Sequence, residues 1–226
     1  MDADFWLDVL KTLIGTAIGA GLAFGSNYFI QHLQRRRDRY AALATAMEVL
    51  RTQLDDFRNY RTGFSAELAE QLAKQKHPVP EWAIARPLAF YFFDSLKFNY
   101  PSLAFVLEYE GQQTLAKLRY AERRYHELAT LAREYNVAVQ RKQERLAQEF
   151  GVGAANLGEV ERRLGPEIFG RIESMIQAIR RHVDLDEKDY LAAEVALSGT
   201  TTKAFPRKPR LALDRVPTNG LKVASP

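Results

Sequence analysis

The feature that most constrains this chain is an uncharged, largely apolar stretch at residues 12–30, TLIGTAIGAGLAFGSNYFI. Because a helix rises about 1.5 Å per residue, this stretch covers roughly the ~30 Å hydrocarbon core of a bilayer. Four arginines follow it and are predicted to set the topology: Arg35, Arg36, Arg37 and Arg39. Basic residues favour the cytoplasmic side of a membrane. The sequence therefore predicts an extracytoplasmic leader at 1–11, a transmembrane anchor at 12–34 and a cytoplasmic remainder.

Two other interpretations of the apolar stretch are a cleaved signal peptide and a buried core helix. A signal peptide needs a basic leader, whereas here three aspartates and one lysine precede the stretch. Its four glycines each cost up to ~1 kcal/mol inside a soluble helix, but membrane helices tolerate glycine better. Both observations favour a single-pass anchor, and the membrane expected for it is a bacterial-type inner membrane.

The two sides of the predicted anchor helix differ in side-chain size. At about 100° per residue, one side gathers small or weakly polar residues: Thr12, Gly15, Thr16, Gly19, Ala23, Ser26 and Asn27. Bulky residues such as Ile14, Ile18 and Leu22 fall on the other side, with Gly21, Gly25 and Ile30 as exceptions. Small residues let membrane helices approach closely, although glycine and alanine are also simply common there. The pattern favours a homo-oligomer, and such an oligomer either packs through a dry seam or forms a water-lined pore.

Composition limits the chemistry and the partners of the remaining chain. The 226 residues include no cysteine, which excludes disulfides, Cys-ligated zinc and a Cys nucleophile. The net charge of +4 comes from the arginines after the anchor and from a tail at 203–226 with six basic residues and one aspartate. Residues 40–202 sum to −2. Nucleic-acid binding usually needs a basic face, so the sequence argues against it.

An all-α domain is expected at residues 35–199, built on a long antiparallel helical hairpin or bundle. Apolar residues recur at three- and four-residue steps from Leu43 to Leu72, and prolines at 78 and 80 end this first helix. A second long helix is expected from about Ser102 to Phe150. Its heptad-like seam, typical of a coiled coil, runs through Leu118, Ala121, Tyr125, Leu128, Ala132, Tyr135, Val139, Lys142 and Leu146.

Three shorter segments and a C-terminal tail complete the expected organisation. A short segment covers 154–164, and Gly165-Pro166 opens a helix because proline suits a first helical turn. Acidic residues at 184–187 start the last helix, which Gly199 is expected to end. Residues 200–226 contain four prolines, six basic residues and no periodicity. This tail is expected to be disordered.

Residues 81–107 are unusually rich in aromatic side chains, between prolines that interrupt long helices. A short helix is expected at 88–98. One interpretation is that the insert fills the core between the long helices. The other is a docking surface for a protein partner, since aromatic residues are enriched in interface cores. Its candidate residues are Trp82, Phe90, Tyr91, Phe92, Phe93, Phe98 and Tyr100.

No segment carries a recognisable catalytic, cofactor or metal signature. The four histidines lack the spacing of a zinc motif, and the acids at 184–189 lack that of a calcium loop. There is no phosphate-binding loop, nucleophile elbow or dinucleotide turn. The sequence predicts no enzyme activity and no cofactor. Its expected role is that of a tether, sensor or scaffold at the lipid bilayer, and the alternative is an oligomeric pore, as in a bacterial defence or toxin-like effector.

Overall fold

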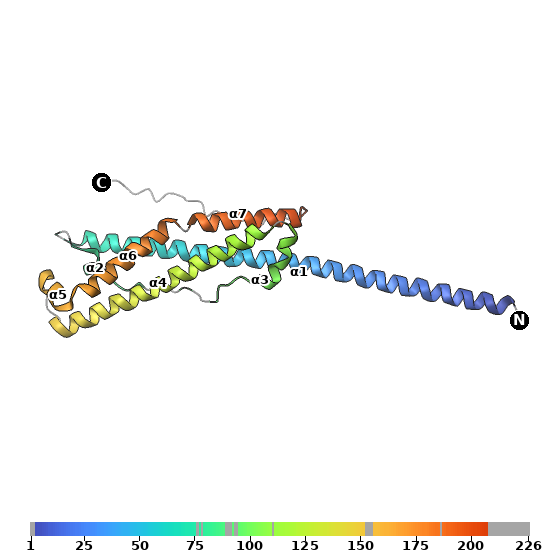
Figure 1. The fold of residues 1–226 in the computed structure, drawn as a ribbon, viewed down its shortest axis with the longest axis horizontal. Helices are drawn as coiled ribbons and strands as arrows, with labels where there is room; N and C mark the ends of the chain where they lie inside the picture. The colour runs from blue at the N-terminus through green and yellow to red at the C-terminus, as the bar shows by residue number, and fades with distance from the viewer. Residues whose placement is uncertain are drawn as a thin grey trace.

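The long N-terminal helix dominates the computed structural model, which describes residues 3–75, 77, 79–88, 92, 95–109, 111–151, 156–185 and 187–207. Helix α1 runs without a break over Ala3–Ala73, 71 residues, or about 107 Å at 1.5 Å per residue. No proline interrupts it. Figure 1 shows its N-terminal half projecting alone, whereas its C-terminal half lies among the other helices.

All regular elements in the described residues are helical, as predicted. After α1 come two short helices, α2 (Glu81–Ile84) and α3 (Tyr100–Leu103), and the 3-10 helix η1 (Ala104–Tyr109). The longer elements that follow are α4 (Gln112–Phe150), α5 (Leu157–Leu164), α6 (Pro166–Leu185) and α7 (Glu187–Ala204). The predicted starts of α6 at Pro166 and of α7 in the acidic segment are confirmed.

The core forms where apolar stripes of the long helices meet. Helix α4 packs more extensively against α6 and α7 than against α1, and α1 contacts mainly α7. The predicted seam of α4 is buried from Leu118 to Lys142, whereas Leu146 is only partly covered. On α1, Leu43, Leu50 and Leu54 are buried. The apolar stripes of α1 and α4 thus form a core together with α6 and α7, and not by packing against each other alone.

The second long helix begins ten residues later than predicted. Asn99 caps α3 by accepting a hydrogen bond from the backbone N–H of Ser102, and η1 follows before α4 starts at Gln112. The chain turns at Gly111, whose N–H donates to the Val106 carbonyl at 3.1 Å. A Cβ atom at Gly111 would lie 2.1 Å from Val106 Cγ1. This close approach requires glycine and separates η1 from α4.

The helix predicted at 88–98 is wrong for the residues of that range that the structure describes, which are 88, 92 and 95–98. Side chains of the long helices bind their backbone groups instead. Asn136 accepts from the Leu88 N–H and donates to the Leu88 carbonyl, both at 2.9 Å. Gln53 donates to the Leu96 carbonyl at 2.8 Å. These backbone groups are therefore satisfied by side chains of the long helices and not by hydrogen bonds of a local helix.

Helix α7 also extends further than predicted, because it continues through Gly199 to Ala204. Thr200, Thr201 and Phe205 are buried, and the hydroxyls of Thr114 and Thr200 lie 3.0 Å apart. Packing against α4 therefore outweighs the helix-breaking tendency of glycine. Of the predicted disordered tail, residues 200–204 are helical, and 208–226 lie outside the described residues.

Candidate functional site

The projecting half of α1 exposes a long apolar surface. Within the described part of the chain, α1 alone is long and apolar enough to cross a membrane, by length and composition, and none of its apolar window is buried. Leu22 is 70% exposed and Phe24 78%. A core helix of a soluble protein is mostly covered by its own chain. The segment therefore does not serve as a core helix of this body.

The small and weakly polar side of this segment is open. Nothing lies within 4 Å of a Cβ atom built on Gly15 or Gly19. The Thr16 hydroxyl donates to the Thr12 carbonyl at 2.8 Å, and the Ser26 hydroxyl donates to the Ala23 carbonyl at 3.0 Å. Both hydroxyls are therefore satisfied inside the helix. This side can approach another helix without leaving those donors unpaired.

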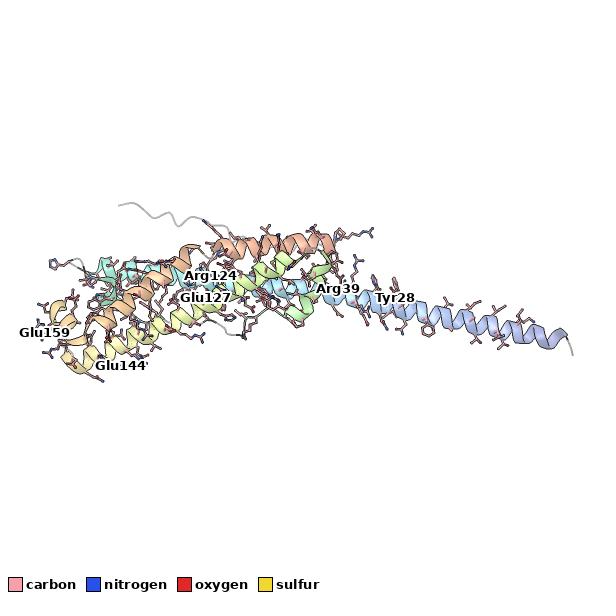
Figure 2. All side chains as sticks on the ribbon, viewed as in Figure 1. Tyr28, Arg39, Arg124, Glu127, Glu144 and Glu159 are labelled. Atoms are coloured by element: carbon pink, nitrogen blue, oxygen red, sulfur yellow. The ribbon has the colours of Figure 1, made fainter. Side chains whose placement is uncertain are left out.

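The arginines beyond the segment differ in their surroundings. Arg39 lies where α1 enters the body, whereas Tyr28 lies on the projecting part (Figure 2). The Arg39 guanidinium donates to both carboxylate oxygens of Glu108 at 2.8 Å and lies 5.1 Å from the ring centroid of Phe105. Arg39 thereby joins α1 to η1. The direction in which these arginines orient the chain stays a prediction.

The described aromatic residues of the 81–107 insert all contact the body. Trp82 and Phe98 are buried, and Trp82 stacks on Phe169 with centroids 4.0 Å apart. Phe92 lies 5.2 Å from the Tyr60 ring. The Tyr100 hydroxyl donates to Glu122 at 2.7 Å. Phe90, Tyr91 and Phe93 lie outside the described residues.

Lys142 forms a buried polar site that sequence reasoning treated only as a seam position. Its side chain is 2% exposed, and Nζ donates to the carbonyls of Trp82, Ala83 and Ala85 at 2.9, 3.2 and 2.9 Å. These carbonyls lie at the C-terminal end of α2, where a positive charge is favourable. Burial, with a smaller effect from the charge of Arg86, lowers the pKa of Lys142 to about 8. The signal in the sequence that could have identified this site is a lysine in an otherwise apolar seam.

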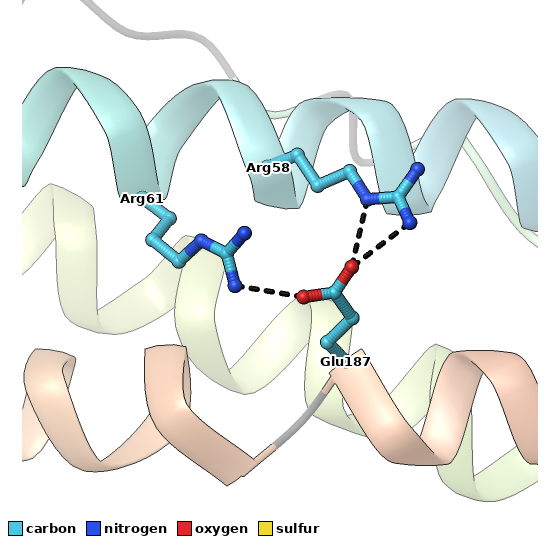
Figure 3. Close-up of polar contacts among 3 residues, drawn as sticks. All are labelled: Arg58, Arg61 and Glu187. Atoms are coloured by element: carbon cyan, nitrogen blue, oxygen red, sulfur yellow. Dashed lines mark hydrogen bonds and ion pairs between the residues drawn. The ribbon is translucent and has the colours of Figure 1, made fainter. Parts of the chain in front are cut away.

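A second polar site joins the N-terminal end of α7 to α1 (Figure 3). Arg58 donates through Nε and Nη2 to one oxygen of Glu187, at 2.9 and 2.8 Å. Arg61 donates to the other oxygen at 2.7 Å. Partial burial alone would raise the pKa of Glu187, but the bonds and charges of the two arginines outweigh it and lower that pKa. Sequence reasoning placed Glu187 at a helix start but gave it no distant partner.

Several polar side chains on the outside of α4 pair with one another. Glu127 binds Arg123 at 2.9 Å and Arg124 at 3.1 Å, and Figure 2 shows Arg124 beside Glu127. Among the described residues, no three His, Asp or Glu side chains form a group that could hold a metal ion. The buried Nε2 of His126 has no hydrogen-bond partner in the described chain.

Comparison of the chain with family models, curated proteins and solved structures found no match. Function is therefore inferred from the physical features of the described residues. The most distinctive of these features are the exposed apolar half of α1 and the four arginines that follow it.

Proposed function

We propose that this protein is a single-pass membrane protein whose α-helical body is held at the cytoplasmic face of a bacterial-type inner membrane. There it would self-associate or bind a protein partner as a tether, sensor or scaffold. The observation that carries the proposal is the complete exposure of the apolar window of α1. Burying one large apolar side chain is worth roughly 1.5–3 kcal/mol. A bilayer offers that burial to all of them at once.

The continuity of α1 supports a mechanical link between membrane and body. The helix that would cross the bilayer is the one that contributes Leu43, Leu50 and Leu54 to the core. Neither proline nor glycine occurs between residues 26 and 62, so no hinge of the usual kind separates the two parts. A tilt or rotation of the membrane segment would move the packed half of α1. This coupling suits a sensor or a scaffold.

Self-association through a dry seam is favoured over a pore. The Thr16 and Ser26 hydroxyls bond within their own helix, and residues 12–30 contain no Asp, Glu, Lys, Arg or His to mark an ion path. A pore would instead place Thr16, Ala23 and Asn27 against water. Pore formation is the second candidate function, and the observation in its favour is that the small-residue side of α1 is open.

Membrane attachment is tested with the full chain in bacterial cells. The protein should stay with membranes after carbonate extraction, and a reporter fused after Pro226 should be active only inside the cell. An externally active reporter would contradict the arginine-based orientation. Release by carbonate would contradict the anchor itself. Deleting residues 1–34 should give a soluble helical domain, because the buried core begins at Leu43.

Single cysteines distinguish the dry seam from the pore, since the chain has none of its own. Cysteines at Thr16, Ala23 and Asn27 should resist a water-soluble thiol reagent in reconstituted vesicles, as should one at Leu22. A thiolate must form in water to react. Selective labelling of the first three, together with ion conductance, would instead establish the pore.

A further inference from the structure

A cavity lies beside α1 immediately after the proposed membrane segment. Its volume is about 440 Å³, and three arginines line it, Arg36, Arg37 and Arg207. Leu33, Tyr40 and Phe205 form its less polar walls. Arg207 follows α7, whose C-terminal end lies beside α1 where the helix leaves the body (Figure 1). The cavity therefore joins residues some 170 positions apart in the sequence.

Phe205 fixes one wall of this cavity. Its ring is buried and meets the Tyr40 ring edge-on, with centroids 5.4 Å apart. Its backbone N–H donates to the Thr201 carbonyl at 2.8 Å, which holds the residue directly against the end of α7. The guanidinium of Arg36 lies 5.9 Å from the Phe205 ring centroid. Arg36 thus lies over the wall that Phe205 forms.

The three arginines form a concentrated positive charge. In the described part of the chain, no carboxylate forms an ion pair with any of them, whereas Arg39 is paired with Glu108. Three guanidinium groups around one cavity repel one another unless an anion lies between them. Guanidinium groups bind phosphate through two parallel hydrogen bonds. The chemistry of the cavity thus matches a phosphate group.

The position of the cavity indicates the source of that phosphate. Arg36 lies six residues beyond Ile30, or about 9 Å along the helix axis. The headgroup layer extends roughly 5–8 Å beyond the hydrocarbon core on each side. Leu33 lies on the bilayer side of the arginines, where a lipid presents its glycerol and acyl carbons. Along α1 away from the bilayer, an apolar group thus precedes the basic groups, as the acyl carbons of a phospholipid precede its phosphate.

We propose that this cavity binds the phosphate headgroup of an anionic phospholipid. The inference rests on the proposed membrane anchoring and adds a specific lipid site to it. Basic pockets beside cytoplasmic helix ends suit such headgroups. A lipid bound there would connect the end of α7 to α1 and to the membrane surface. The body would then be held against the bilayer by two points of the chain instead of one.

The test uses the purified full chain with phosphatidylglycerol or with phosphatidylcholine of the same acyl chains. Binding is measured by native mass spectrometry. The variant is Arg37→Gln with Arg207→Gln, because the structure gives neither side chain an ion pair within the described residues. The control is Arg141→Gln with Arg145→Gln, two exposed arginines of α4. Both double variants lose the same charge.

The wild type and the control should retain phosphatidylglycerol in preference to phosphatidylcholine. The cavity variant should lose about thirtyfold in phosphatidylglycerol affinity, since each basic residue near an anionic surface contributes roughly a fivefold factor. Equal affinities in the two double variants would overturn the proposal. Saturable binding of inorganic phosphate without a lipid preference would assign the cavity to a soluble anion instead.

Failure of the anchor and failure of the lipid site give different results. Both double variants keep residues 12–30, so both should remain in vesicles after carbonate extraction. Loss of all three proteins from vesicles would contradict the anchor. Retention of all three without a phosphatidylglycerol preference would contradict only the lipid site.

Discussion

The two halves of α1 have the same secondary structure and opposite surroundings. Residues 10–37 are exposed throughout, whereas from Leu43 to Leu68 one side of the helix is buried in the body. The first half is apolar on most of its circumference. The second half carries an apolar stripe with charged residues opposite, the usual pattern of a helix on a soluble core. The body therefore buries the apolar stripe of the second half, but it leaves the apolar surface of the first half uncovered.

The largest effect should come from removing a leucine in the buried half. Leu50 is fully buried and Leu22 is 70% exposed. Leu50→Ala should lower the free energy of unfolding of the body by about 3 kcal/mol through lost burial and a cavity. Leu22→Ala should change it by less than about 0.5 kcal/mol. Urea unfolding in mild detergent measures both.

The fluorescence of Trp82 can report this unfolding, because the residue is buried against Phe169. Trp6 should be replaced by Phe in every variant so that the signal comes from the body. Similar losses of stability in Leu50→Ala and Leu22→Ala would show that the exposed half packs on the body in solution. That result would remove the contrast between the two halves.

The next effect concerns the pH dependence of the body. The pKa of Lys142 is lowered from 10.5 to about 8 in the folded chain, so the unfolded chain binds this proton more tightly. The contribution of Lys142 to the free energy of unfolding, taken as the difference from a variant without this lysine, should then rise as the pH increases from about 8 to about 10.5. The gain should approach about 3 kcal/mol, at about 1.4 kcal/mol per pH unit of difference. Urea unfolding at several pH values measures the slope.

Lys142→Met should abolish this rise, because methionine does not titrate. Lys117→Met is the matched control on the same helix, since Lys117 is exposed, and it should keep the wild-type slope. The slope is more informative than the stability itself, because Lys142→Met also leaves three carbonyls without their donor. If both variants retain the rise, another group titrates in this range.

A smaller effect is expected where α7 meets the buried half of α1. Glu187→Gln should reduce stability at pH 7 by roughly 1–2 kcal/mol, because the bonds to Arg58 and Arg61 lose their charge on one side. The folded pKa of Glu187 is lowered, so its contribution is present above the unfolded pKa and is lost as the pH falls through the folded pKa. The difference between wild type and variant should therefore disappear in acid.

Thermal unfolding at pH 7 and at acidic pH measures this difference. Glu159→Gln is the control, because the Glu159 pair with Arg163 is solvent-exposed within one helix, and exposed pairs contribute little. A difference for Glu187→Gln that persists at acidic pH would assign its effect to packing rather than to charge.

The contrast between the halves of α1 was largely predictable, and the contacts of the body were not. Hydropathy located the exposed segment, and three- and four-residue spacing located the buried stripes, because both signals are local. The extended segment around Leu96 and the continuation of α7 past Gly199 depend on distant side chains, Gln53 and Thr114. The cavity of Arg36 and Arg207 was missed for the same reason. Its two sides come from opposite ends of the chain.

The smallest effect is expected for self-association through the exposed half of α1. Gly15→Leu with Gly19→Leu should weaken self-association in bilayers by about 1 kcal/mol or more, because two bulky side chains separate the helix backbones. Ile14→Leu with Ile18→Leu, on the bulky side, should have much less effect. The body should keep its stability in both, since nothing lies within 4 Å of either glycine. Energy transfer between labelled chains in vesicles measures the association.

Equal weakening by both pairs of substitutions would show that the small-residue side has no special role. If neither pair weakens association, the bilayer is the only partner of this half of α1.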